Sequence, residues 1–267
     1  MFDDRKQVED RLDRVLQQRI RPAVHGATIP LTLTAWHVPD EPVSVAEALK
    51  AEYEPFAVGE RWGKPWSTSW IRVVGTVPAE WAGKRVEAVF DLGFIGDWPG
   101  GQAEALVYDA SGQPVKGIEP RNQYVPVANP ANGGEPVELL LEAAGNPDIL
   151  ANGFIPTPLG DKLTAPPDPL YTFARADLAV LDEDVWHLVL DIEVAGELMR
   201  QLSEHDTRRH ELLRALERML DALDIADVSS TAAAARAELA FVLSRPAHAS
   251  AHTLSSVGHA HIDSAWL

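Results

Sequence analysis

The sequence predicts a mainly β protein with some α-helix, in which an antiparallel β-sandwich is followed by a small helical bundle. Between about Tyr53 and Leu190, short apolar runs are separated by Gly, Pro and Asn and show no helical periodicity between them. From Ala195 onward, apolar residues return at helical spacing. The chain has 267 residues and is 46% hydrophobic, which is enough for the cores of about two domains of ~150 residues each.

The first segment, residues 1–52, is expected to be an N-terminal helix and a connector. One apolar stripe at helical spacing predicts the helix, which Pro22 closes: Val8, Leu12, Val15, Leu16 and Ile20. From Thr28 to about Asp40, β-branched residues alternate, but Pro30 and Pro39 interrupt them. This stretch is therefore interpreted as an irregular strand and loop.

Residues 53–194 are expected to form the sandwich. Two Pro/Gly-rich stretches, 122–136 and 153–169, are too long for simple hairpins, and we expect at least one to border a site or to pack on a neighbouring domain. The predicted strands are Thr68–Val77, Arg85–Leu92, Ala103–Tyr108, Val137–Ala143 and Trp186–Val194.

Residues 195–250 are expected to form the helical bundle, with Asp206 or Thr207 capping its second helix. Residues 251–267 are then expected to begin a further domain. Within them, Leu254 to Val257 has the composition of a short strand.

Charge and cysteine content exclude several classes of function. The net charge is −17, so nucleic acid and anionic membrane surfaces would be repelled. There is no cysteine, so a metal site would have to use His and carboxylates. The N-terminus carries acidic residues, and no apolar stretch is long enough to span a membrane, which predicts a cytoplasmic protein.

The candidate chemistry lies in the sequence Gly-His-Ala-His-Ile-Asp-Ser-Ala-Trp-Leu, residues 258–267. In an extended chain alternate side chains share a face, so His259, His261 and Asp263 would project together. Imidazole nitrogens and a carboxylate oxygen are ligands that a zinc-class ion requires. Metal ligands at a strand end are also typical of the opening of a parallel barrel.

This motif resembles the opening of the catalytic barrel in glycoside hydrolase family 38, the retaining zinc-dependent α-mannosidases, and most of all their cytosolic and vacuolar branch. The strand at residues 66–70 and the helical stretch at 208–216 are similar to the region that precedes that barrel. The resemblance implies a jelly-roll or galactose-binding-like sandwich, helices, and the first strand of a truncated (β/α) barrel.

The resemblance also implies that His261 and Asp263 are the first two zinc ligands, and that His259 is not one. The remaining ligands, the nucleophile and the general acid/base would come from later in the barrel, so no catalytic residue is expected in this chain. We therefore expect an N-terminal fragment, inactive alone, whose parent acts on α-mannoside oligosaccharides and whose partner is the missing catalytic barrel. The mannosidic linkage, and whether the parent is a homo-oligomer, are left open.

Two alternatives remain open. In an amidohydrolase-type metal hydrolase, His259 and His261 would both be ligands. In a free-standing carbohydrate-binding module, the His-rich end would be incidental.

Tryptophans of the sandwich are the other candidate site residues. Trp66 and Trp70 would share one face of a strand with Thr68, and that face is expected to be core. Contact of these two rings with sugar or with the barrel is the alternative.

Overall fold

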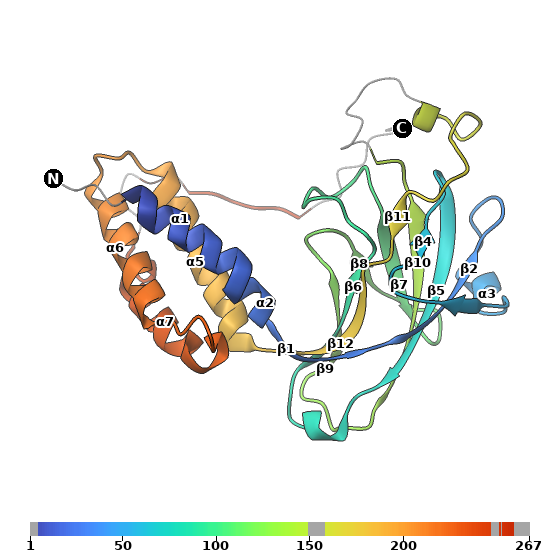
Figure 1. Ribbon diagram of the computed structural model, residues 1–267, viewed down its shortest axis with the longest axis horizontal. Helices are drawn as coiled ribbons and strands as arrows, with labels where there is room; N and C mark the ends of the chain where they lie inside the picture. The colour runs from blue at the N-terminus through green and yellow to red at the C-terminus, as the bar shows by residue number, and fades with distance from the viewer. Residues whose placement is uncertain (1–4, 149–157, 247–250, 252, 259–267) are drawn as a thin grey trace. The chain divides into compact units, whose positions relative to one another are not determined.

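The computed structural model describes residues 5–148, 158–246, 251 and 253–258 (Figure 1). It divides into two compact units. The β unit is Ala27–Leu181, and the helical unit combines Met1–Gly26 with Asp182–Leu267. Both ends of the chain thus contribute to the helical unit, whereas the expected organisation placed the N-terminal helix apart from the later bundle.

The β unit is an antiparallel sandwich, as the sequence predicts. Its larger sheet has six strands in the order β3-β2-β5-β10-β7-β8. These strands are β2 (Thr32–His37), β3 (Glu54–Phe56), β5 (Ser67–Thr76), β7 (Glu104–Asp109), β8 (Pro114–Ile118) and β10 (Pro136–Gly145).

The second sheet has four strands in the order β1-β12-β6-β9, and a two-stranded sheet joins β11 to β4. The strands of these sheets are β1 (His25–Pro30), β4 (Arg61–Trp62), β6 (Val86–Asp91), β9 (Tyr124–Ala128), β11 (Tyr171–Thr172) and β12 (Arg175–Leu181).

The pairing of β5 with β10 is the longest ladder of the β unit. It runs without a register shift from Thr76 opposite Pro136 to Ser67 opposite Gly145. Alternate residues of both strands, such as Ile71 and Leu141, are fully buried in the core between the sheets. This is the alternation that places one face of a sheet in a core.

The expected connector at residues 28–40 is wrong, because this stretch contains two strands. β1 belongs to the four-stranded sheet and β2 to the six-stranded one. The change of sheet occurs at Leu31, whose N–H donates to the carbonyl of Ala176. Pro30 ends one strand and thereby permits the change.

The stretch 122–136, expected to be a loop, contains β9. Pro126 lies in the middle of this strand, opposite Glu87 of β6. A proline cannot donate to a ladder, but β9 is an edge strand and needs a partner on one side only. The position of β9 at the sheet edge could not be known from the local sequence.

Residues 186–194, expected to be a strand, are helical. They lie in α5 (Glu183–Gln201), so the β unit ends at Leu181 and not at 194. The buried positions Val185, Leu188, Val189 and Ile192 follow a helical spacing that a window beginning at Trp186 hides. Asp182 caps this helix by accepting a hydrogen bond from the N–H of Val185.

In the helical unit, the first helical run is α1 (Arg5–Val15), a π-helical turn (Leu16–Ile20) and α2 (Arg21–Ala23), and it buries the predicted stripe. The others are α5, α6 (Thr207–Ala222) and α7 (Val228–Leu243). Helix α1 packs against α6 and α2 against α5, while α7 packs on both α5 and α6 (Figure 1). Asp206 caps α6, as the sequence indicates. No helix in the described part of the chain is long and apolar enough to cross a membrane.

Arg209 links three helices of this unit. From α6, its Nη1 donates to the carbonyls of Met199 (2.7 Å) and Leu202 (3.3 Å) at the end of α5. Its Nη2 donates to Oε1 of Glu9 on α1 at 2.7 Å. These carbonyls are among those that a helix end leaves without an intrahelical partner.

Replacing Arg209 by Ala should destabilise the helical unit by about 2–3 kcal/mol, because the partly buried carboxylate of Glu9 and two carbonyls lose their donor. Arg218→Ala is the control on the same helix, since Arg218 pairs with Glu238 at the surface and should cost less than about 1 kcal/mol. Urea denaturation followed by circular dichroism measures both. Equal losses would contradict the role given to Arg209.

Gly93 permits a close approach between β6 and β11. Its φ is +95°, and a Cβ added there would lie 2.3 Å from the carbonyl oxygen of Thr172. Gly96 also has a positive φ, of +67°, but an added Cβ would meet nothing within 4 Å. Comparing an alanine substitution at Gly93 with one at Gly96 therefore distinguishes the effect of a steric clash from that of backbone strain alone.

Gly93→Ala should destabilise the β unit clearly more than Gly96→Ala, for which left-handed strain alone predicts a loss of about 1 kcal/mol. Denaturant titration followed by tryptophan fluorescence gives both free energies of unfolding. If Gly93→Ala costs no more than Gly96→Ala, the backbone contact with Thr172 is not tight in solution.

Candidate functional site

The predicted metal residues lie outside the part of the chain that the structure describes. This holds for His259, His261 and Asp263, so their role as ligands stays a prediction. Residues 253–258 are described and form no strand; Leu254 and Val257 are exposed. Among the described residues, no group of three or more His, Asp or Glu side chains could hold a metal ion.

The acidic residues 182–184 do not form a cation site in the described structure. Asp182 caps α5, and Asp184 pairs with Arg236 at 3.4 Å. Negative charge at a helix N-terminus is favourable in itself. His210 is an exposed residue of α6 whose Nε2 lies 3.0 Å from the carbonyl oxygen of Glu204.

Trp66 and Trp70 lie in different surroundings, although the sequence predicts one shared strand face. Trp70 is in β5 and is fully buried, together with Val38, Ala48 and Leu140, under the short helix α3 (Val45–Ala48). Its ring therefore has no exposed face on which a sugar could stack, and the core interpretation applies to it. Trp66 precedes β5 and is only partly buried.

Trp66 occupies a strained position in a tight turn. The N–H of Ser67 donates to the carbonyl of Lys64 at 3.0 Å, which closes a turn with Pro65 and Trp66 at its centre. Proline followed by a residue of positive φ is typical of a type II turn, whose third position normally requires Gly or Asn. Trp66 has a φ of +65° and is the one non-glycine residue of the described chain with a positive φ.

Two glycines hold this turn against the end of the long ladder. The N–H of Trp66 donates to the carbonyl of Gly145 at 2.9 Å. A Cβ on Gly145 would lie 2.6 Å from the carbonyl oxygen of Lys64 and 2.8 Å from the Cα of Gly63. Backbone contact at this distance excludes any larger residue, so the turn is fixed to the last residue of β10.

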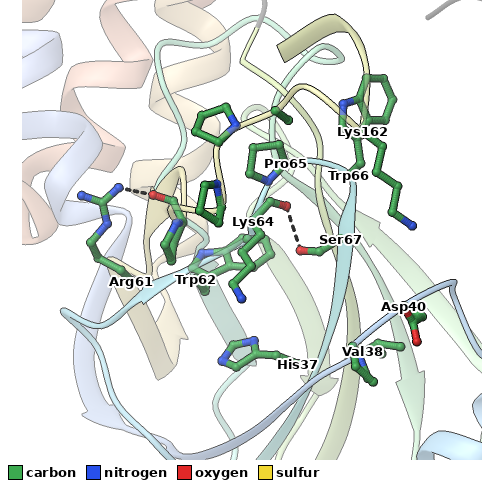
Figure 2. Close-up of a pocket in the computed structure, with 16 residues that line it drawn as sticks. His37, Val38, Asp40, Arg61, Trp62, Lys64, Pro65, Trp66, Ser67 and Lys162 are labelled. Atoms are coloured by element: carbon green, nitrogen blue, oxygen red, sulfur yellow. Dashed lines mark hydrogen bonds between the residues drawn. The ribbon is translucent and has the colours of Figure 1, made fainter. Parts of the chain in front are cut away.

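The turn borders a pocket of about 550 Å³ in the β unit. Figure 2 shows His37 at one end of it and Trp66 at the other. The lining residues come from the end of β2 and the segment after it, from β4 and the turn, and from the loop before β11: His37, Val38, Pro39, Asp40, Arg61, Trp62, Gly63, Lys64, Pro65, Trp66, Ser67, Lys162, Ala165, Pro166, Pro167 and Pro169.

Hydrogen bonds and an ion pair fix the walls of this pocket. Arg61 donates from Nη2 to the carbonyl of Pro169 and so ties the loop to β4 (Figure 2). Trp62 is buried, and its Nε1 donates to the carbonyl of Leu92 at 2.8 Å. Lys162 pairs with Glu41 at 2.7 Å. The pocket therefore has a largely preformed shape.

His37 is an uncharged group of the pocket at neutral pH. Its Nδ1 lies 2.8 Å from Oγ of Ser69, its partner across the β2–β5 ladder. Partial burial lowers the pKa of His37, and the charge of Lys64 lowers it further. The pocket therefore offers an uncharged polar ring in addition to the cations Arg61, Lys64 and Lys162.

A second hollow, of about 650 Å³, lies over β7, β8 and β10. Its lining among the described residues includes three carboxylates, Glu104, Glu119 and Glu142, and no aromatic ring. Lys116 is the one cation among these described lining residues, so carboxylates outnumber cations there. The pocket at Trp66 is therefore the better candidate for ligand binding.

The sequence alone does not reveal this pocket as a site. The expectation that the stretch 153–169 borders a site fits its described part, since residues 162, 165–167 and 169 line the pocket. The missed signal is Lys-Pro-Trp-Ser, residues 64–67, of which only Trp66 and Ser67 are assigned above, as the start of a strand. Proline at the second position of a four-residue stretch is a turn signal.

Replacing Trp66 by Gly should give a more stable protein than replacing it by Ala, by about 1 kcal/mol, because both variants lose the ring but only Gly adopts a positive φ without strain. Denaturant titrations of the two variants measure the difference. If Ala is as stable as Gly, the left-handed conformation at this position is not maintained in solution.

Comparison with known proteins places the β unit in a family. The family described as "Alpha-mannosidase, jelly roll domain" matches residues 29–179, which is almost the whole β unit. Alpha-mannosidase 2C1 of Homo sapiens is 28% identical over 251 residues, which are 93% of this chain and 23% of that protein. The mouse protein of the same name is 27% identical over 252 residues.

A third relative is Alpha-mannosidase G of Dictyostelium discoideum, 23% identical over 230 residues, which are 85% of this chain and 20% of that protein. The chain thus spans less than a quarter of the length of these curated relatives. Because the family match extends over more than half of the chain, this protein belongs to the α-mannosidase jelly-roll domain family.

Proposed function

We propose that this chain is the jelly-roll and helical region of a retaining, zinc-dependent α-mannosidase of glycoside hydrolase family 38. The observation that carries the proposal is the sequence at residues 258–267, where a His-x-Asp pair follows Gly-His-Ala in a chain whose β unit belongs to the α-mannosidase jelly-roll domain family. The names of the relatives support glycosidase activity in the whole protein. An amidohydrolase function has no comparable support.

The donor chemistry of His261 and Asp263 fits a zinc ion, since a neutral imidazole nitrogen and a carboxylate oxygen are both common zinc ligands. Two residues at i and i+2 would lie on one side of an extended chain. When bound, zinc would hold sugar hydroxyls in place and so orient the ring for attack. His261 and Asp263 would contribute by binding the ion.

The rest of the chemistry would come from outside these 267 residues. Retaining glycosidases use two carboxyl groups, one as nucleophile and the other as general acid and base. We propose that both lie in the catalytic barrel of the whole protein. The β unit and the helical unit would then act as accessory regions of a larger enzyme that cleaves α-mannosides.

The test uses the natural full-length protein with the substitution Asp263→Ala. We expect the zinc content, measured by elemental mass spectrometry, and the rate of hydrolysis of an aryl α-mannoside both to fall. The rate should fall by at least about 100-fold, because losing a zinc ligand should cost no less than losing a residue that hydrogen-bonds to a ligand. The control is Glu80→Ala, an exposed carboxylate of the β unit, which should change neither. Full zinc and full activity in Asp263→Ala would remove Asp263 from the metal site.

A further inference from the structure

We propose that the pocket at Trp66 is a binding site for a neutral hexopyranoside, with the indole ring of Trp66 as the surface on which the sugar packs. The site would lie in the β unit and would bind sugar without cleaving it. Its existence does not depend on the proposed α-mannosidase function. Only the preference for a mannoside over other hexosides rests on that function.

The first argument is the backbone conformation of Trp66. A left-handed conformation is strained for a residue other than Gly, and such strain is found most often at functional sites. At the third position of this turn, Gly would remove the strain at no steric cost. A large aromatic residue kept in this strained position on a pocket wall points to a role of its ring in binding.

The second argument is the composition of the pocket walls. Besides Trp66 and Trp62, five prolines line the pocket, so much of its surface is apolar and rigid. The face of a pyranose ring that carries C–H groups packs well on such surfaces, and an aromatic side chain loses little entropy on binding. The volume of about 550 Å³ is in the range of small-molecule sites.

The third argument is the charge distribution. Three of the ten Lys and Arg residues between positions 27 and 181 line this pocket, Arg61, Lys64 and Lys162, and Asp40 lines it too. Each sugar hydroxyl both donates and accepts a hydrogen bond, so a polyol can use cations and a carboxylate together. His37 adds an uncharged group.

An anionic ligand fits this arrangement less well. Glu41 already neutralises the charge of Lys162, whereas the N–H donors that Lys162 and Arg61 keep are sufficient for neutral hydroxyls, which need no charge partner. Asp40 and the net charge of −17 would both repel an anion. A neutral sugar meets neither obstacle.

The experiment titrates the ¹⁵N-labelled chain with methyl α-mannoside, methyl α-glucoside and methyl β-galactoside, each to about 50 mM, and follows the indole N–H signals of its eight tryptophans by NMR. We expect at least one glycoside to bind with a dissociation constant of about 1–10 mM, as suits a ligand of this size, and to shift the Trp66 signal. That signal is assigned by its absence in Trp66→Gly.

Trp66→Gly should weaken binding at least 10-fold while remaining as stable as the unchanged chain. The matched control is Trp98→Ala, because Trp98 is 59% exposed and lies in the same unit outside this pocket. This control should keep full affinity. Lys64→Gln serves as a second variant of the pocket and should also weaken binding, since it removes a charged donor at an exposed position.

Three results would overturn the proposal: no binding of any of the three glycosides, unchanged affinity in Trp66→Gly, or loss of affinity in Trp98→Ala instead. A ten-fold preference for glucuronate or glucose 6-phosphate would also overturn it and assign the pocket to an anion. None of these results depends on Asp263, so the proposal and the α-mannosidase function can fail separately.

Discussion

The pairing of β5 with β10 is the constraint on which the rest of the β unit depends. These strands form the middle of the six-stranded sheet, so β2 and β3 attach through β5, and β7 and β8 attach through β10. Their ten paired positions show no bulge, whereas the β6–β9 and β7–β8 ladders each contain a register shift. A ladder without bulges fixes the backbone at its end, and the turn that contains Trp66 lies at the end of this ladder.

The location of the pocket follows from that geometry. Ser67 and Gly145 are the last pair of the ladder, and the hydrogen bond from Trp66 to Gly145 extends it by one step. The strained residue is therefore held by the most regular element of the unit. Backbone strain persists only where the surroundings determine the conformation more strongly than the residue itself does.

Much of the fold could be predicted from local sequence, because the deciding forces are local. Alternating apolar residues indicate β5 and β10, and the stripe from Val8 to Ile20 indicates the first helix. The errors occur where a distant partner decides. Pro126 is tolerated because β9 is an edge strand, and residues 186–194 are helical because Asp182 begins a helix that buries Val185 and Leu188. For the site, the sequence singles out Trp66 but not its turn, and the pocket depends on a loop about 100 residues further along the chain.

The division of the chain has a consequence for the order of folding. The β unit is inserted between the first helices and the last three, and the segments that flank it meet within the helical unit, where the N–H of Asp182 donates to the carbonyl of Val24 at 2.9 Å. In an unfolded chain, bringing α2 and α5 together would close a loop of more than 150 residues, at an entropic cost of about 4 kcal/mol. A folded β unit removes most of that cost. Its strands β1 and β12 are neighbours in one sheet, so the places where the chain enters and leaves the unit are already close together. During synthesis, α1 emerges first but must wait for the whole sandwich before it can join its helical partners.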